Sequence, residues 1–347
     1  MGLIRIFLAL SVMLTHIGAV TWFPLAPAGF AVQCFYLLSG FYIAIGLNER
    51  YTKPSMNTEF YMGRVLRLWP VYLFSILILI PTGMIESVAH TISQQPLLIQ
   101  IVAVFSNIFM LGSDLLLHVS SVDGNIVFSE YGIDKNHNGA QNIINLPAWT
   151  LSIEILFYLV APFILRSQKK TLAFFIMAII YALAAKIFTA TTSTPLRTDL
   201  YYPGPALYFS LGAGAYWLHK LYAGDLKKMA MLYALVLVLV ASCTMHRTQE
   251  AFTLVALAAL SPILFLKTKN SKIDKWFGDL SYPLYITHIP VTIIVRWLGL
   301  FEANTYTYVA SIIVGTLVAV YAIELPVERF RKRAMSRRKT QSQIATS

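Results

Sequence analysis

Arg5 and His16 lie in one apolar stretch, RIFLALSVMLTHIG, which runs from residue 5 to residue 18. In an α-helix, the eleven-residue separation of the two side chains corresponds to about 16 Å. If this helix crosses a bilayer core about 30 Å thick, Arg5 stands at the interface and His16 near the middle. An ionisable group at that depth is costly and usually faces a protein-lined or water-filled site. His16 is therefore a candidate for proton-transfer chemistry, and a histidine that only hydrogen-bonds within a helix bundle is the structural alternative.

Two more ionisable side chains are expected at compatible depths in other apolar stretches. His288 lies in GDLSYPLYITHIPV, about 16 Å from the start of its helix, and Glu154 lies in WTLSIEILFYLVAP, about 10 Å from the opposite end of its own. Each could be a structural hydrogen-bonding group. Three such groups, with Ser152, Ser281, Tyr282 and Tyr285 on the same helices, predict a polar cavity inside the bundle.

A second basic cluster is expected at the level of Arg5. Arg64 and Arg67 are spaced i, i+3, so both project from one face of a helix. Arginines next to a membrane often do no more than set topology and bind lipid phosphates. Three guanidinium groups below a histidine-bearing cavity also suit a phosphate-rich ligand, held by forked charge-assisted hydrogen bonds.

Composition identifies the class of protein that must position these groups. Hydrophobic residues make up 57% of the 347 residues, charged residues only 12%, and the mean hydropathy is +0.64. These values indicate an all-α integral membrane protein without a large soluble domain. Cys34 and Cys243 lie in apolar runs, and no spacing typical of a disulfide or a metal site occurs.

Apolar runs recur along the whole chain. We expect spans near 4–23, 30–47, 65–85, 148–165, 171–189, 203–218, 229–245, 251–266, 278–299 and 305–323, with a further apolar run at 97–117 and an extended polar loop at 118–146.

Lysine and arginine residues give the orientation. Of the 27 basic residues, 22 fall in alternate connections and at the two ends of the chain, which predicts that both termini are cytoplasmic. The remaining basic residues are Lys135, Lys186, Arg197, Arg247 and Arg296. The net charge of +11 is thus a topology signal and does not indicate nucleic acid.

Two cytoplasmic ends require an even number of crossings, whereas eleven apolar runs are present. The charge pattern is irregular only between residues 86 and 148. We therefore predict a bundle of about ten transmembrane helices, with 97–117 re-entrant or lying at the outer face.

The order of several short segments resembles acyltransferase family 3, a family of membrane proteins. The resemblance rests on Arg5 and His16 with ten residues between them, FYLLSGFYI (35–43), RVLRLWPVY (64–72), WTLSIEILFY (149–158), GDLSYPLYITHIPV (278–291) and IELPVERF (323–330). It covers about residues 3–330, so we expect one acyltransferase domain over 1–330 and a basic cytoplasmic tail over 331–347.

The resemblance implies an O-acyltransferase. Such a protein moves an acetyl or other short acyl group from cytoplasmic acyl-coenzyme A to a hydroxyl of a polysaccharide, glycolipid or related saccharide. It implies His16 as the catalytic histidine and Arg5, Arg64 and Arg67 as the donor-binding residues. Acyl-CoA would be a co-substrate, with no tightly bound cofactor and no metal.

The roles of the other candidates stay open at this stage. His16 can act as the base in direct transfer or form an acyl-histidine intermediate. Glu154 can orient a histidine or bind the hydroxyl groups of the acceptor. Candidates for stabilising the oxyanion or contacting substrate are Ser281, Tyr282, Tyr285, Trp149 and His288.

Two other functions compete with acyl transfer. One is a transporter or flippase for a lipid-linked saccharide, although no internal repeat or paired broken helices are evident. The other is a lipid-binding scaffold whose polar residues only join helices. For all three we expect a multi-pass protein of a bacterial-type inner (plasma) membrane, in contact with lipids.

Overall fold

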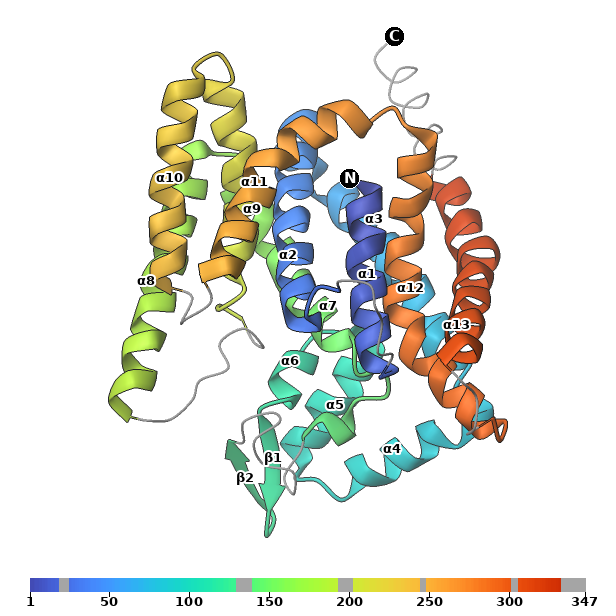
Figure 1. The fold of residues 1–347 in the computed structure, drawn as a ribbon. Helices are drawn as coiled ribbons and strands as arrows, with labels where there is room; N and C mark the ends of the chain where they lie inside the picture. Colours follow the sequence, from blue (N-terminus) through green and yellow to red (C-terminus); the bar gives the residue numbers. More distant parts are fainter. Residues whose placement is uncertain (19–24, 129–138, 193–201, 244–247, 301–304, 332–347) are drawn as a thin grey trace.

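The computed structural model describes residues 1–18, 25–128, 139–192, 202–243, 248–300 and 305–331. Within these residues, ten long helices form a bundle (Figure 1). They are α1 (Gly2–His16), α2 (Ala28–Ile45), α3 (Asn57–Leu77), α7 (Ala148–Ile164), α8 (Gln168–Thr192), α9 (Ala206–Tyr222), α10 (Leu226–Cys243), α11 (Thr248–Thr268), α12 (Lys272–Trp297) and α13 (Thr305–Ala319).

Several of these helices are long and apolar enough to cross a membrane. Six segments among the described residues satisfy both criteria. They are Ala28–Arg50, Pro54–Thr82, Gln168–Thr191, Leu226–Cys243, Gln249–Thr268 and Thr305–Arg331. The protein therefore has the helices of an all-α, multi-pass membrane protein.

Short elements complete the chain. They are η1 (Gly46–Arg50), η2 (Pro54–Met56), η3 (Ile80–Thr82), α4 (Met84–Ser93), α5 (Leu97–Phe109), α6 (Ser113–Leu116), β1 (Val119–Val122), β2 (Asn125–Phe128), η4 (Gly139–Asn142) and η5 (Val320–Glu324). In Figure 1, α4 lies across one end of the bundle, and β1 and β2 project from the same end.

The region 97–146 differs from a single apolar run followed by a loop. The run at 97–117 is split into α5 and α6, and α5, with 13 residues, is about 20 Å long, too short to cross a bilayer. Part of the expected polar loop forms an antiparallel hairpin in which Val122 pairs with Asn125. Asp123 and Gly124 make its turn with positive φ angles of 50° and 77°, which an Asp-Gly pair adopts readily.

Some expected features lie outside the described residues. These are residues 19–23 of the first expected span, Lys135, Arg197, Arg247, and the basic tail from residue 332 onwards. The first helix itself ends earlier than expected, at His16, so His16 stands at the end of its helix and not within it.

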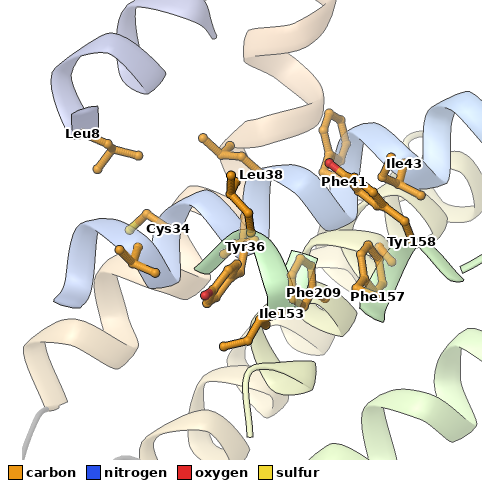
Figure 2. Close-up of a cluster of buried hydrophobic side chains, with 14 of the residues drawn as sticks. Leu8, Cys34, Tyr36, Leu38, Phe41, Ile43, Ile153, Phe157, Tyr158 and Phe209 are labelled. Carbon is orange, nitrogen blue, oxygen red and sulfur yellow. The ribbon is translucent and has the colours of Figure 1, made fainter. Parts of the chain in front are cut away.

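α2 and α9 form the centre of the bundle, and their closest approach depends on two glycines. A Cβ atom on Gly40 would lie 2.1 Å from the Phe209 carbonyl oxygen, and one on Gly212 would lie 1.9 Å from that of Leu37. Aromatic side chains fill the space around this crossing (Figure 2). Phe157 on α7 stacks on Phe209 of α9, with ring centroids 4.1 Å apart.

A proline in α12 exposes a carbonyl that another segment binds. Pro290 has no N–H to donate to the carbonyl of Ile286, four residues earlier. The side-chain amide of Asn145 donates to this carbonyl at 3.0 Å and to Ser75 Oγ at 2.8 Å. The segment before α7 is thereby fixed to α3 and to the part of α12 that carries His288.

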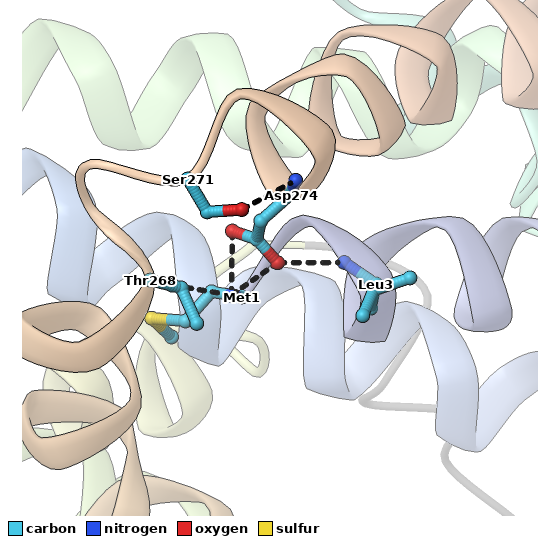
Figure 3. Close-up of polar contacts among 5 residues, drawn as sticks. All are labelled: Met1, Leu3, Thr268, Ser271 and Asp274. Carbon is cyan, nitrogen blue, oxygen red and sulfur yellow. Dashed lines mark hydrogen bonds and ion pairs between the residues drawn. The ribbon is translucent and has the colours of Figure 1, made fainter.

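The opposite end of α12 is fixed to the start of α1 (Figure 3). Ser271 caps α12 by accepting a hydrogen bond from the amide of Asp274. The Asp274 carboxylate accepts hydrogen bonds from the Met1 amino group at 2.8 Å and from the Leu3 amide at 3.2 Å. We call this end of the bundle, where Met1, Asp274 and Arg166 lie, the N-terminal face.

Candidate active site

A cavity of about 440 Å³ lies among α1, α2, α3, α7, α11 and α12. Gly2, Lys269, Asp274 and Lys275 line it at the N-terminal face. Thr150 of α7 and Tyr285 of α12 line it deeper in the bundle. The cavity therefore extends inward along α1 and α12.

Arg5, Arg64 and Arg67 all line this cavity. None of these guanidinium groups forms an ion pair with a carboxylate of the described residues. The Nε atom of Arg64 is buried and has no hydrogen-bond partner among the described residues. The Arg64 guanidinium carbon lies 5.7 Å from the ring centroid of Phe60 and 5.7 Å from that of Tyr158. The three arginines are half-buried, and Glu154 and Asp279 line the same cavity. Half-buried guanidinium groups without an ion pair are suited to bind an anion.

Arg64 and Arg67 lie deeper in their helix than the sequence indicated. The apolar run begins near residue 65, whereas α3 begins at Asn57 after Pro54 starts a short 3-10 turn. The first turns of α3 are amphipathic, so hydropathy alone places the start of the helix too late. The two arginines consequently project from within α3 into the cavity.

Glu154 also lines the cavity, on α7. Its Oε1 accepts hydrogen bonds from Ser39 Oγ at 2.6 Å and from the Tyr158 hydroxyl. No hydrogen bond joins it to either histidine among the described residues. The structure therefore places Glu154 with the arginines, and its neighbours Ser39 and Tyr158 were not candidates from sequence, although Tyr158 is one helical turn from Glu154.

His16 and His288 form a pair. His16 Nδ1 lies 2.9 Å from His288 Nε2, and the two ring planes are nearly parallel, at 14°. His16 is the last residue of α1 and is exposed, whereas His288 is fully buried. His288 Nδ1 lies 2.6 Å from the carbonyl oxygen of Tyr285.

These two distances assign the protons of a neutral pair. A carbonyl oxygen only accepts, so His288 Nδ1 carries the hydrogen and donates it to Tyr285. Nε2 of neutral His288 is then an acceptor, and His16 Nδ1 donates to it. His16 Nε2 is left unprotonated, as a general base or a nucleophile requires.

Tyr285 lies between the cavity and the histidine pair. Its ring lines the cavity and is 6.0 Å from the ring of His288, whereas neither histidine lines the cavity. The Tyr285 hydroxyl and Thr150 Oγ1 are 3.0 Å apart. Tyr285 and Thr150 are thus polar residues of the inner cavity wall, and the ring of Tyr285 lies next to His288.

The remaining candidates are placed differently. Ser281 and Tyr282 line the cavity, but their hydroxyl groups donate to the carbonyls of Gly278 at 2.7 Å and Leu68 at 2.6 Å. Trp149 does not line the cavity and packs, partly buried, against the core. Among the described residues, no three His, Cys, Asp or Glu side chains are grouped so that they could hold a metal ion.

Comparison with known proteins identifies the domain. A family model described as an acyltransferase domain matches residues 1–324, which include the cavity and the histidine pair. No curated protein and no solved structure matches the chain.

Proposed function

The chain belongs to acyltransferase family 3, and we propose that it transfers an acetyl or other short acyl group from cytoplasmic acyl-coenzyme A to a saccharide hydroxyl. The acceptor would be a cell-surface polysaccharide, glycolipid or related saccharide. The observation that carries the proposal is a cavity that is lined by three guanidinium groups, none of them in an ion pair with another described residue, and that ends beside a histidine pair. The family match favours an acyltransferase and gives no support to the transporter alternative.

In this proposal the protein crosses the inner membrane ten times, with both termini in the cytoplasm. The N-terminal face of the bundle is then cytoplasmic, so donor can reach the arginines from the compartment that supplies it. The residues from 331 onwards form a basic tail on the same side.

The donor's diphosphate would bind Arg5, Arg64 and Arg67, and its pantetheine arm would extend along the cavity towards Tyr285. Arg5 and His16 are about 16 Å apart along α1. An extended pantetheine arm can cover that length. The thioester would then reach the histidine pair once the Tyr285 side chain moves aside.

In direct transfer, His16 Nε2 takes the proton of the acceptor hydroxyl as its oxygen attacks the thioester carbonyl. The new C–O bond forms, the C–S bond breaks, and the proton passes from His16 to the departing thiolate of coenzyme A. A positioned base of this kind contributes about 10² to 10⁴ in rate. The Tyr285 hydroxyl donates to Thr150 Oγ1 in this structure, because the Thr150 hydroxyl donates to the Pro147 carbonyl. Once the Tyr285 side chain moves aside from Thr150, its hydroxyl can donate to the developing oxyanion.

The acyl-histidine route uses the same nitrogen as a nucleophile. His16 Nε2 attacks the thioester, coenzyme A departs, and the acceptor hydroxyl then takes the acyl group from the histidine. His288 holds His16 in the required tautomer in both routes.

The test uses purified protein, radiolabelled acetyl-CoA and candidate glycans. We expect label transfer by the wild type and none by His16→Ala at equal expression. Normal transfer by His16→Ala would defeat both routes. Label retained on the wild-type protein without acceptor would identify the acyl-histidine route, and saccharide transport without coenzyme would favour a flippase.

A further inference from the structure

Two lysines line the cavity at the N-terminal face, outside the cluster of arginines. Lys269 directly follows α11, and Lys275 lies in the first turn of α12. Both are exposed, and both belong to the cavity wall. From sequence they were assigned only to topology.

Helical spacing places these lysines on the faces that form the cavity. On α11, the lining residues Phe265 and Thr268 precede Lys269 by four and one positions. On α12, the lining residues Lys275, Gly278, Asp279, Tyr282 and Tyr285 recur at helical intervals along one face. Lys275 and Tyr285, ten residues apart, are about 15 Å apart along that face.

The arginines lie between these two levels. Gly2 of α1 packs against the backbone of Asp274 and Gly278, beside Lys275. Arg5 is one helical turn further inward from Gly2. The cavity therefore presents lysines at its outer part, guanidinium groups next, and Tyr285 at its inner end.

Charge at the outer part of the cavity favours a second anion there. Two acidic side chains of the cavity wall lie near Lys275. Asp279, one helical turn further along α12, forms no ion pair with either lysine among the described residues. The carboxylate of Asp274 already accepts hydrogen bonds from Met1 and Leu3. Its charge is thus largely satisfied within the protein. The lysine ammonium groups remain available to a ligand that enters the cavity.

We propose that Lys269 and Lys275 bind the 3′-phosphate of the acyl-CoA donor and so select it over donors without that group. This inference rests on the proposed function, because the diphosphate must occupy the arginines. With the thioester at the inner end, the adenosine and its 3′-phosphate fall on the outer side of the diphosphate, where the lysines lie. Phe265, one turn before Lys269, offers the adenine an aromatic wall.

The experiment compares the binding of coenzyme A and 3′-dephospho-coenzyme A to the full chain in detergent, by calorimetry. We expect the wild type to bind coenzyme A about tenfold more tightly than 3′-dephospho-coenzyme A. Two exposed ion pairs between the lysines and the 3′-phosphate together change the affinity by about that factor. In Lys269→Ala/Lys275→Ala the ratio should fall close to one through weaker binding of coenzyme A alone. Raising the salt concentration should reduce the wild-type ratio.

Lys272→Ala is the matched control, because Lys272, the first residue of α12, is exposed but does not line the cavity. It should keep the wild-type ratio. A double variant that keeps the ratio, or that weakens both ligands equally, overturns the assignment of the lysines and leaves the proposed function standing. Wild-type protein that binds neither ligand contradicts the proposed function itself, as does Arg64→Ala that binds both normally.

Discussion

At the scale of single residues, the direction of the hydrogen bonds makes His288 a positioning residue for His16. The Tyr285 carbonyl fixes the tautomer of His288, and His288 in turn fixes the tautomer of His16. His288 is fully buried and outside the cavity, so it does not contact the donor's phosphates. Its loss should therefore slow the chemical step without weakening donor binding.

We expect His288→Leu to lower kcat about 100-fold or more while KM for acyl-CoA stays within about twofold. His288→Gln should restore part of kcat, because a side-chain amide oxygen can accept the hydrogen of His16 Nδ1. Steady-state kinetics of both variants measure this. Equal kcat values for Leu and Gln, or a KM effect as large as the kcat effect, would contradict the positioning role.

Asp274, in the first turn of α12 ahead of the apolar stretch, gives a pH-dependent contribution to stability. Burial opposes its ionisation, but hydrogen bonds from the Gly2 amide, the Met1 amino group and the Leu3 amide outweigh burial and lower its pKa to about 2. Because the pKa is lower in the folded protein than in the unfolded chain, ionised Asp274 stabilises the fold above about pH 4. This contribution is lost as the pH falls towards 2.

Asp274→Asn should therefore lower the free energy of unfolding by about 1–3 kcal/mol at pH 7, and the deficit should shrink between pH 4 and pH 2. Thermal unfolding in detergent at several pH values checks it. Asp225→Asn is the control, because Asp225 is exposed and its carboxylate accepts a hydrogen bond from the Lys228 amide, without an ion pair among the described residues. A deficit that stays constant down to pH 2 would rule out ionisation as the cause.

The sequence predicted how far along its helix each polar side chain lies better than it predicted which neighbouring helix that side chain faces. Counting residues along their helices put His16 and His288 at compatible depths, and the structure has them 2.9 Å apart. The same counting put Glu154 at a compatible depth, yet Glu154 contacts Ser39 and Tyr158. Depth follows from the rise per residue, whereas the facing side depends on how the helices pack, which no single segment specifies.

At the scale of elements, the α2–α9 crossing depends on glycine at a defined position. Gly212 and Gly214 lie on the same helix, but only Gly212 meets α2; a Cβ atom on Gly214 would have nothing within 4 Å. Small residues permit such close backbone approach between membrane helices. Alanine substitutions at the two positions therefore distinguish the effect of packing against α2 from the effect of helix propensity.

Gly212→Ala should destabilise the protein by about 1–3 kcal/mol, because the added methyl group forces α2 and α9 apart. Gly214→Ala should be neutral or stabilising, since alanine is favoured over glycine in a helix by about 1 kcal/mol. Thermal unfolding of the two variants in the same detergent is the measurement. If both variants have the same stability, the close crossing is not required.

Helix boundaries show what hydropathy can and cannot predict. It found the apolar body of α12 but missed its first turn, which begins at the Ser271 cap and carries Lys275. It likewise missed the first turns of α3, which position Arg64. In both helices, polar first turns belong to the helix yet lie outside the apolar run, and both of them supply cavity residues.

At the scale of the whole molecule, α4 and α5 decide the topology. Ten crossings require that the chain stays on the outer side from the end of α3 to the start of α7. The split of 97–117 into α5 and α6 agrees with this, because α5, with 13 residues, is shorter than each of the ten long helices of the bundle. Exposed Leu97, Leu98, Ile101, Phe105 and Ile108 would then face lipid at the outer surface.

Single cysteines test this arrangement in a background of Cys34→Ala and Cys243→Ser. His90 on α4 and Asn125 on β2 are exposed on either side of α5 in the sequence. Lys53 and Lys169 are exposed close to Arg166, which donates a hydrogen bond to the carbonyl of Lys53 and lies three residues before Lys169. A membrane-impermeant maleimide applied to intact cells should label His90→Cys and Asn125→Cys. It should label Lys53→Cys and Lys169→Cys only after the membrane is opened. If α5 crossed the membrane, His90→Cys and Asn125→Cys would be labelled from opposite sides. The number of crossings would then be eleven, and because two cytoplasmic termini require an even number, one of the other ten helices could not be a crossing.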